Sequence, residues 1–418
     1  MPENWKTYKL DDLGTIARGK SKHRPRDAAH LYGGEYPFIQ TGDVKGANHK
    51  LYCHSQTYSE TGLKQSKLWP KDTMCITIAA NIAETTILTY PACFPDSIIG
   101  FIADEAKCNI DFIEYMMQYF KKEVQSHSIG SVQDNINLAT FQRVEFLVPP
   151  VAEQRAIASI LSALDDKIEL NLQMNKTLEE MAMALYKHRF VDFGPFQNGK
   201  FVESELGMIP EGWKNVEFRG ILSLIKDGSH NPPKRVENGV KFIAGATDIK
   251  KLEVTFDKCT YISRVDYDQM HRNWEVREGD VLMTIVGTIG NTAIVQKMDL
   301  PFSLQRSIAI FRANPEIPNN FIYLLINSTD FRGYVQAHTN PTGQPGIYLK
   351  TLGDFKLSIP KNEILNQFNI IITPWFRQMF SNLNENQTLT TLRDTLLPKL
   401  ISGQIRVKDA EQMLAASL

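Results

Sequence analysis

A basic segment near the N-terminus has the residue types that contact nucleic acid. Residues 18–26 read Arg-Gly-Lys-Ser-Lys-His-Arg-Pro-Arg, with five Lys or Arg and no acid. Gly19 and Pro25 favour a loop. Such a loop suits phosphate contacts combined with base-edge readout, in which Arg to guanine is the commonest specific pair. The alternative is a solvated charged loop. The candidate DNA-binding residues of this segment are Lys20, Ser21, Lys22, His23, Arg24 and Arg26.

A second loop, residues 226–235, matches the first. It reads Lys-Asp-Gly-Ser-His-Asn-Pro-Pro-Lys-Arg, and its His230 and Pro232 lie 207 positions after His23 and Pro25. A shared frame with different neighbouring residues is what two readers of different base sequences need. The candidates here are Ser229, His230, Asn231, Lys234 and Arg235.

Two further pairs of segments carry polar candidates. Residues 128–135 and 339–346 are polar loops rich in Gly, Pro, Gln and Asn, and Gln and Asn side chains suit the donor and acceptor of adenine. The alternative is ordinary turn chemistry. Residues 77–83 and 284–290 could bring backbone close to a phosphate, although a tight β-hairpin is the simpler explanation. The candidates from these segments are Asn81, Gln133, Asn135, Thr288 and Gln344.

Two catalytic interpretations find little support in the sequence. Asn231-Pro-Pro-Lys234 resembles the Asn-Pro-Pro-aromatic signature of amino-methyltransferases, but Lys replaces the aromatic residue that stacks on a flipped base. Asp96 with Glu105 and Lys107 resembles the carboxylate set of metal-dependent nucleases, yet the second half aligns Arg306, Pro315 and Ile317 with them. Cys53-His54 has no second pair to complete a metal site. The sequence predicts no catalytic residue and no metal ligand.

These segments belong to an internal repeat that spans most of the chain. Residues in the first half recur in order 204 to 211 positions later, and the pairs include Trp5 with Trp213, Phe38 with Phe242, Asp43 with Asp248, Thr77 with Thr284 and Phe101 with Phe311. The order never inverts. Such self-similarity indicates two copies of one structural unit.

Each copy begins with a mixed segment of about 150 residues. Short runs rich in β-branched and aromatic residues lie between turn signals, which predicts strands. These runs are residues 35–44, 73–90 and 144–148 in the first copy and 240–249, 280–296 and 355–359 in the second. One helix is predicted in each copy, over 111–127 and 319–336.

Each copy ends in a long helical pattern. Residues 153–190 contain neither Gly nor Pro, and residues 363–402 have similar apolar spacing. Apolar residues recur at three- and four-residue steps, the pattern of a coiled-coil seam. They are Ile157, Ile160, Leu161, Leu164, Ile168, Leu178, Met181 and Leu185 in the first pattern, and Ile364, Phe368, Ile371, Trp375, Leu389, Leu392 and Leu396 in the second. Pro374 and Pro398 are expected to kink the second helix or end it early.

Both helical patterns turn polar in the middle. Asn171 and Asn175 lie in the first, and Asn382, Asn384 and Asn386 in the second. If the helices pack antiparallel, the two middles meet, and a polar layer fixes their register. The expected fold is α+β, with two mixed domains separated by two long helices in an antiparallel coiled coil of pseudo-two-fold symmetry. Such a ruler fits duplex DNA, whose groove repeats about every 34 Å, or a symmetric protein partner.

Composition narrows the class of protein. The 418 residues are 43% hydrophobic and 22% charged, which is ordinary for globular domains. The net charge is −1, and no segment is basic enough to indicate nucleic-acid binding by charge alone. We find no apolar run that could cross a membrane, no secretory signal pattern and no Cys-x-x-Cys pair, so a cytoplasmic protein without a membrane contact is expected.

Several motifs together resemble the specificity subunits of type I restriction-modification systems. The stretch PPVAEQRAIASILSALDDKIE over 149–169 is similar to their central conserved region, and LLPKLISGQI over 396–405 to their distal one. GMIPEGW at 207–213, DGSH at 227–230 and GDVLMT at 279–284 also fit. The first copy departs modestly, with Lys-Asp-Thr at 71–73 where the second has Glu-Gly-Asp-Val at 278–281.

The resemblance implies a domain plan. It assigns residues 1–151 to a first target-recognition domain, 152–190 to the central conserved helix and 191–205 to a linker. It assigns 206–361 to a second target-recognition domain, 362–403 to the distal conserved helix and 404–418 to a C-terminal tail.

The resemblance also implies partners. Each target-recognition domain would read one half of a split, asymmetric site in double-stranded DNA, while the helices set the spacer and dock two modification (methyltransferase) subunits. Those subunits would use S-adenosylmethionine, and restriction/translocase subunits would use ATP and Mg. This chain itself would bind no cofactor and have no catalytic activity. The alternatives are a two-headed protein scaffold, or a nuclease or methyltransferase in its own right.

Overall fold

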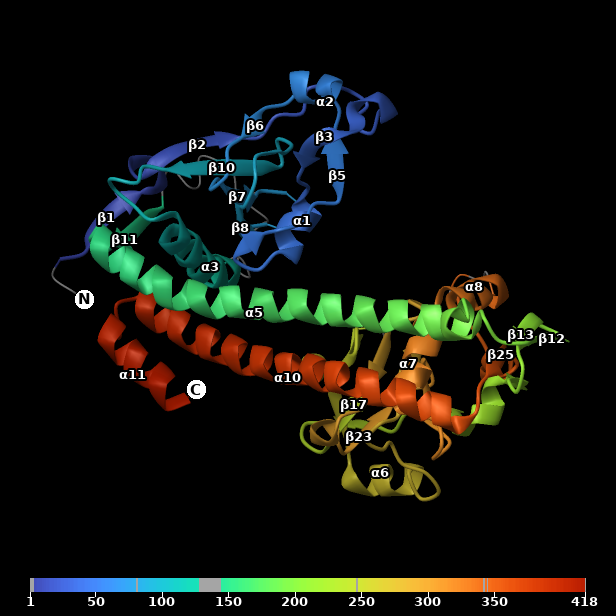
Figure 1. The fold of residues 1–418 in the computed structure, drawn as a ribbon. Coiled ribbons are helices and arrows are strands. Elements are labelled where there is room, and N and C mark those ends of the chain that lie inside the picture. Colours follow the sequence, from blue (N-terminus) through green and yellow to red (C-terminus); the bar gives the residue numbers. More distant parts are fainter. Residues whose placement is uncertain are drawn as a thin grey trace. The chain divides into compact units, whose positions relative to one another are not determined.

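A computed structural model of the chain describes residues 4–79, 82–127, 144–245, 247–340, 343 and 345–417. Two compact units are present, and each contains part of both long helices. Unit 1 comprises residues 1–171 and 384–418, and unit 2 comprises residues 172–383. Figure 1 shows the elements of both.

Unit 1 contains a mixed domain, which we call head 1, built on two sheets and a two-stranded ribbon. The five-stranded sheet has the order β2 (Gly14–Arg18), β10 (Ile98–Ala103), β7 (Met74–Thr77), β8 (Thr85–Leu88) and β4 (Lys50–Leu51). The four-stranded sheet has the order β5 (Gln56–Tyr58), β3 (Tyr32–Phe38), β9 (Ala92–Cys93) and β6 (Leu68–Trp69). β1 (Lys6–Lys9) pairs with β11 (Glu145–Val148). The helices are α1 (Thr41–Gly46), α2 (Glu60–Lys64) and α3 (Ile110–His127).

Unit 2 contains a second mixed domain, head 2, with the same core. Its main sheet has the order β15 (Leu222–Asp227), β24 (Ile308–Ala313), β21 (Val281–Thr284) and β22 (Thr292–Ile294). Its second sheet has the order β16 (Arg235–Val236), β20 (Thr260–Ile262), β17 (Val240–Ile243) and β23 (Phe302–Leu304). The ribbons are β14 (Lys214–Glu217) with β25 (Lys356–Ile359), β12 (Phe201–Ser204) with β13 (Gly207–Pro210), and β18 (Ile249–Lys250) with β19 (Glu253–Val254).

The strand orders of the two heads match, as the repeat predicts. The order β2–β10–β7–β8 in head 1 corresponds to β15–β24–β21–β22 in head 2. In each second sheet one pair is parallel, β3 with β9 and β17 with β23. Phe101 and Phe311, which the repeat pairs, are both fully buried on the corresponding strands β10 and β24. The aligned aromatic residues therefore mark equivalent core positions.

Some predicted elements differ from those observed; the strand expected over 240–249, for example, ends at Ile243. The single helix expected over 319–336 is two helices, α7 (Asn319–Asn327) and α8 (Thr329–His338), because the extended residue Ser328 interrupts it and caps α8 by accepting from the Phe331 N–H. The strand expected over 35–44 ends at Phe38. Residues 41–46 form α1, where Asp43 accepts a hydrogen bond from the Gln40 N–H. At Ser328 and at Asp43 a polar side chain gives the backbone a local alternative.

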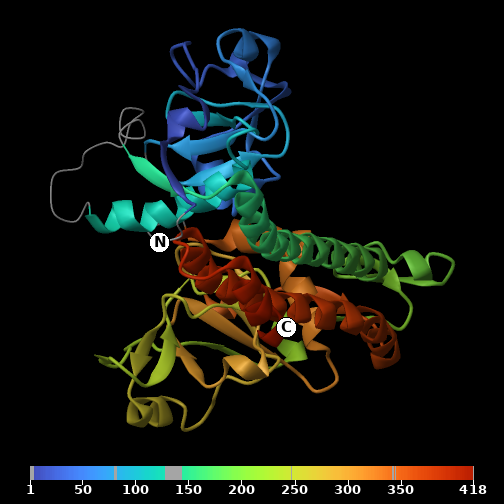
Figure 2. The same cartoon turned by 90° about the vertical axis from the view of Figure 1, so that its left-hand side faces the viewer.

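The first long helix, α5 (Val151–Tyr186), continues into one π-helical turn, Lys187–Val191. The second, α10 (Asn362–Ile401), is followed by α11 (Val407–Ser417). In unit 1 the first part of α5 lies beside the last part of α10 and runs in the opposite direction, since Asp165 contacts Arg393 and Asn171 contacts Asn386. Both views show this pairing (Figure 1 and Figure 2).

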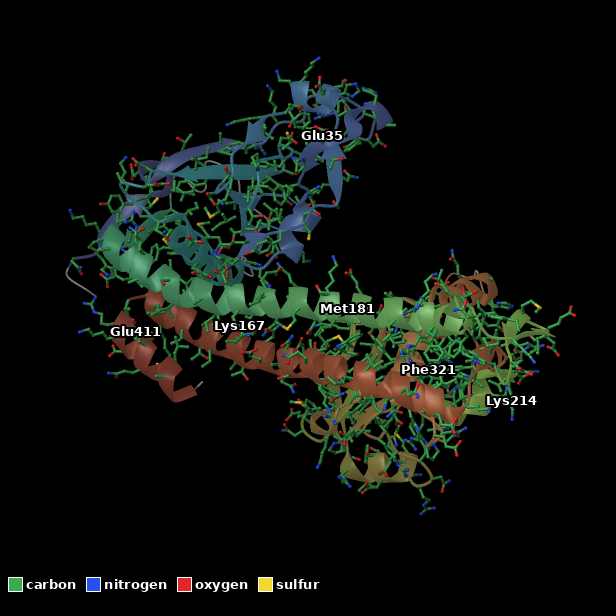
Figure 3. The ribbon with its side chains drawn as sticks, viewed as in Figure 1. Glu35, Lys167, Met181, Lys214, Phe321 and Glu411 are labelled. Carbon is green, nitrogen blue, oxygen red and sulfur yellow. The ribbon has the colours of Figure 1, made fainter. Side chains whose placement is uncertain are left out.

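The apolar seam of α10 is shifted by one position from the predicted seam at three places, where Leu365, Ile372 and Phe376 are buried in place of Ile364, Ile371 and Trp375. The buried residues are Leu365, Phe368, Ile372, Phe376, Met379, Leu389, Leu396 and Leu400. Ile371 is 37% exposed, and Met181 of α5, labelled in Figure 3, is 44% exposed, so neither belongs to a seam. Both residues satisfy the three- and four-residue spacing, but in each helix the adjacent apolar residue is the one that faces the core. In Figure 3 Phe321 of α7, only 1% exposed, lies inside unit 2.

Of the two effects expected of Pro374 and Pro398, a kink or an early end of the second helix, the early end is wrong. α10 runs without a break through Pro374 and Pro398. Each proline removes one backbone hydrogen bond and costs about 3 kcal/mol in an isolated helix. Buried seam residues flank both prolines, among them Ile372 and Phe376 around the first. Their burial offsets that cost.

Candidate nucleic-acid interface

The candidate loops of head 2 gather at one end of its main sheet. The Arg306 N–H donates to the Ser229 carbonyl (3.1 Å), and the Ile285 N–H donates to the Ser307 carbonyl (2.8 Å). The Gly287 N–H donates to the Pro345 carbonyl (2.8 Å), which brings in the loop 339–346. Three of the sequence-predicted segments, 226–235, 284–290 and 339–346, therefore meet on one rim, which we call rim 2.

Head 1 brings the counterparts of two of these segments together on a rim that we call rim 1. The Lys20 N–H donates to the Phe94 carbonyl (3.0 Å) where β2 ends, and the Ile78 N–H donates to the Ser97 carbonyl (3.0 Å) where β7 ends. These bonds correspond to those of Ser229 with Leu304 and of Ile285 with Ser307. The basic loop 18–26 and the turn 77–83 thus share a rim.

Glycine allows both basic loops to leave the sheet at the same point. Gly19 and Gly228 donate to the carbonyls of Ile98 and Ile308. A Cβ on Gly19 would collide with the Pro95 carbonyl, and one on Gly228 with the Leu304 carbonyl. The close approach therefore requires glycine in both heads.

The backbone of loop 18–26 is stabilised by side chains from outside the loop and by one of its own, Arg24. Gln65 Oε1 accepts from the N–H groups of Lys22 (2.6 Å) and His23 (2.9 Å). Ser66 Oγ donates to the Lys20 carbonyl (2.7 Å). Arg24 folds back and donates to the carbonyls of Ser21 and His23, both at 2.8 Å. Arg24 thus stabilises the loop instead of projecting from it.

The remaining side chains of this loop divide into paired and free groups. Ser21 is buried, with its Oγ 3.5 Å from the Tyr58 hydroxyl. Arg26 forms an exposed ion pair with Asp96, with Nη2–Oδ distances of 2.8 and 3.0 Å. Within the part of the chain that the structure describes, the ammonium groups of half-buried Lys20 and exposed Lys22 have no partner. These two lysines are free to meet phosphate.

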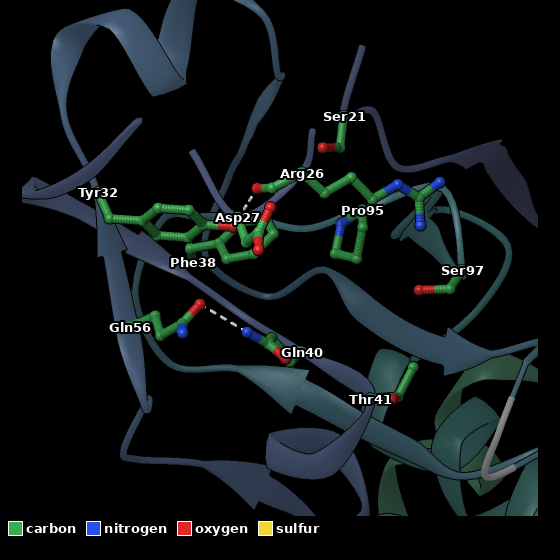
Figure 4. A pocket seen from close by; sticks show the side chains of 10 residues that line it. All are labelled: Ser21, Arg26, Asp27, Tyr32, Phe38, Gln40, Thr41, Gln56, Pro95 and Ser97. Atoms are coloured by element: carbon green, nitrogen blue, oxygen red, sulfur yellow. Dashed lines mark hydrogen bonds between the residues drawn. The ribbon is translucent and has the colours of Figure 1, made fainter. Parts of the chain in front are cut away.

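A hollow of about 360 Å³ opens beside loop 18–26 (Figure 4). Its lining includes Ser21, Arg26, Asp27, Tyr32 and Ser97. The Tyr32 hydroxyl donates to the Arg26 carbonyl (2.7 Å), which fixes the loop against the second sheet of head 1.

The side chains of loop 226–235 are similarly divided. His230 Nε2 lies 2.8 Å from Asp227 Oδ2. The Arg235 guanidinium lies over the Phe242 ring, 4.0 Å from its centroid. Asn231 and Lys234 are exposed and have no partner among the described residues. Ser229 is half-buried, and Thr288 lies exposed on the turn that contacts Pro345.

The offset between the two basic loops at their start differs from the one predicted for their tips. The matched hydrogen bonds place Gly19 opposite Gly228, an offset of 209, whereas pairing His23 with His230 needs 207. The histidine environments also differ, because His23 Nδ1 contacts the Pro25 carbonyl (3.1 Å) and His230 contacts Asp227. The loops therefore share their start and diverge at once. Four further candidates, Asn81, Gln133, Asn135 and Gln344, lie outside the described residues.

One rim residue was missed as a binding candidate. Arg306 is exposed, and its guanidinium has no partner among the residues described. It occupies the position of Asp96 in head 1, since Ile98 and Ile308 accept equivalent hydrogen bonds. In the sequence, the alignment of Arg306 with Asp96 in the repeat could have indicated that Arg306 lies on the rim. Rim 2 thus has a free cation where rim 1 has an acid paired with Arg26.

The nuclease-like set does not assemble. Asp96 precedes the six-residue strand β10 and Glu105 follows it, which separates them by roughly 20 Å at about 3.3 Å per residue. Among the described residues, no cluster of three His, Cys, Asp or Glu side chains could hold a metal ion. The described helices also include none with the length and hydropathy of a membrane span.

Comparison with known proteins places this two-headed fold in a family. The family described as "Type I restriction modification DNA specificity domain" matches the chain twice, over residues 2–180 and 210–388. The chain belongs to this family and contains two copies of its domain. The resemblance to type I specificity subunits is thereby confirmed, as is the internal repeat.

Individual relatives agree along the whole length. The chain is 26% identical to the type I restriction enzyme MjaIX specificity subunit of Methanocaldococcus jannaschii, covering 98% of this chain and 95% of the relative. It is 24% identical to the HindI specificity subunit of Haemophilus influenzae, covering 96% and 100%. The crystal structure of a type I S subunit from M. genitalium has the same fold, with a TM-score of 0.55, 16% identity and coverage of 95% and 96%.

Proposed function

We propose that this chain is the non-catalytic DNA-reading subunit of a type I restriction-modification complex, in which each head reads one half of a split, asymmetric site. The observation that carries this proposal is the pair of equivalent rims. In each head, polar and basic loops lie at the equivalent end of the equivalent sheet. The side chains on the two rims differ. Two such readers on one chain suit a site with two unlike halves.

The long helices would set the spacer between the half-sites. A helix of 36 residues, such as α5, is about 54 Å long at roughly 1.5 Å per residue, which exceeds one turn of duplex DNA. Hydrogen bonds between asparagines support an antiparallel coiled coil with a fixed register: Asn171 donates to Asn386 (2.9 Å) in unit 1, and Asn382 donates to Asn175 (2.8 Å) in unit 2. In this proposal the repeat gives the assembly a pseudo-two-fold axis.

Partner subunits would supply the chemistry. Two modification subunits would dock on the helices and bring S-adenosylmethionine, while restriction subunits would bring ATP and Mg. A net charge of −1 fits this division, because partners that enclose the DNA would contribute much of the basic surface. The complex would work in the cytoplasm, where the DNA is.

Single-molecule methylome sequencing tests this proposal. Cells that express the chain with its modification subunit are compared with cells that lack only the chain. We expect a split motif with a fixed gap that disappears without the chain. If no methylated motif depends on the chain, the proposal is wrong, and a protein scaffold becomes the better interpretation.

A further inference from the structure

Two glutamines lie together at the hollow of rim 1. Gln40 Nε2 donates to Gln56 Oε1 at 2.5 Å, and both side chains line the hollow (Figure 4). Gln40 follows β3, and Gln56 begins the antiparallel neighbour β5, directly opposite Phe38. Since β3 is parallel to β9, Gln40 emerges at the same end of head 1 as Pro95 and Ser97.

The pair presents a fixed combination of hydrogen-bonding groups. One amide oxygen and one amide nitrogen are used in the bond between the glutamines, so the Gln40 oxygen and the Gln56 nitrogen remain available. If both amides were turned over, one oxygen and one nitrogen would still remain. The major-groove edge of adenine offers a donor at N6 beside an acceptor at N7, which is the complement of this combination.

The charges around the hollow favour a base edge over a phosphate. Arg26 is already paired with Asp96, and the carboxylate of Asp27 also lines the hollow. A phosphate would meet an acid and a neutralised guanidinium there. Neutral amides with nearby hydroxyls suit the polar edge of a base pair.

Head 2 keeps the frame of this site and changes its side chains. Asp43 accepts from the Gln40 N–H (2.8 Å), and Asp248 accepts from the N–H groups of Ala244 (2.9 Å) and Gly245 (3.2 Å). Phe38 pairs with Gln56, and the equivalent Phe242 pairs with Thr260. Gln40 and Gln56 therefore correspond to Ala244 and Thr260, which are both exposed. A structural role common to the heads would not explain why the glutamines occur in head 1 alone.

We infer that Gln40 and Gln56 together determine specificity for an adenine in the half-site read by head 1, a role that rests on the proposed function. The hydrogen-bonded amides act as one rigid, two-point reader. Ala244 and Thr260 offer no such reader, so head 2 has no adenine specificity from this position.

Selection from randomised DNA tests the inference. The purified complex of this chain with its modification subunits is incubated with duplexes that carry the split motif, randomised in one half-site at a time, and the bound duplexes are sequenced. We compare the wild type with Gln40→Ala/Gln56→Thr, which copies head 2, and with Gln56→Glu, which keeps the shape but removes the donor. Gln197→Ala, a surface glutamine outside both rims, is the control.

We expect the wild type to select adenine at one position, and both rim variants to lose that selection about 10- to 100-fold, as for a bidentate contact. The other positions and the other half-site should not change. If the variants keep the wild-type preference, or lose selection evenly at all positions, the inference is overturned while the proposed function stands. If the wild type selects no split motif, both fail.

Discussion

Tyr115 on α3 donates a hydrogen bond to the carboxylate of Asp165 on α5, with an Oη–Oδ2 distance of 2.7 Å. Unit 2 has a counterpart, in which Tyr323 on α7 donates to Glu179 on α5 at 3.0 Å. All four side chains are buried. In each unit a tyrosine from the head therefore bonds a carboxylate of the same long helix, which links the part that would read DNA to the helix that would set the spacer.

This bond in unit 1 should contribute measurably to stability. Tyr115→Phe leaves Asp165 with Arg393, 2.6 Å away, as its remaining partner. Hydrogen bonds to buried charged groups are worth about 1.5–3 kcal/mol, so the free energy of unfolding of the variant should fall by about that amount. Its melting temperature should fall accordingly. Tyr348→Phe, at a tyrosine 70% exposed, is the matched control and should change nothing. Equal melting temperatures for all three proteins would contradict this role.

A buried histidine in unit 1 should make its stability depend on pH. His49 lies between Glu114 (2.7 Å) and Asp111 (2.9 Å). Burial lowers the pKa of His49, but the hydrogen bonds to Asp111 and Glu114 raise this pKa by more than burial lowers it, to about 9. Since this pKa lies above the unfolded value of about 6.5, the stabilisation is complete below pH 6.5 and is lost as the pH rises through 9.

The size of this effect follows from the same linkage. Unit 1 should lose about 3 kcal/mol of its free energy of unfolding between pH 6.5 and pH 9.5. His49→Gln should be less stable at pH 6.5 and should show little of this dependence. Urea unfolding at several pH values measures both. A wild-type slope that persists in His49→Gln would assign it to other groups.

Arg306 should contribute to DNA affinity without contributing to specificity. As a free cation on rim 2, it is placed to neutralise one phosphate. Arg306→Ala should weaken binding of the assembled complex to all sequences alike and lower the slope of log K against log salt by about 1. The control is Arg264→Ala, since Arg264 is already paired with Asp268 on α6 (Arg264–Met270). A sequence-dependent loss would instead indicate that Arg306 contacts a base.

Shortening a long helix should change the spacer. Deletion of seven residues from α5 removes about 10 Å while nearly preserving the direction of the apolar face. We expect a changed gap in the methylated motif or a failure to assemble with the modification subunits. An unchanged gap in an assembled complex would exclude the helices as the spacer.

Sequence reasoning predicted the repeat and the helices because these depend on periodic burial. Trp5 and Trp213 are both buried, as are Phe38 and Phe242 at equivalent sheet positions. The seam residues were predicted wrongly where two adjacent apolar residues could each face the core. Leu365 and Ile372 form the seam beside Ile364 and Ile371, and spacing alone cannot choose between adjacent apolar residues.

The candidate interface was less predictable than the fold. Lys22 and Arg24 are two residues apart in one basic loop, yet Lys22 is free and Arg24 is bonded to the loop's own carbonyls. Gln40 and Gln56 could not be predicted as a pair from the sequence, because only strand pairing brings them together. Charge and residue type indicate a loop, but the partners of each side chain depend on the tertiary fold.

The central claim is that the two heads read separate halves of one site, and exchange of a single loop tests it most directly. Residues 18–26 are replaced by the loop of a related specificity subunit, and the methylomes of cells carrying the wild type and the variant are sequenced in the presence of the modification subunit. We expect one half of the split motif to change while the other half and the gap stay the same. A change in both halves, or in neither while methylation continues, would contradict the central claim.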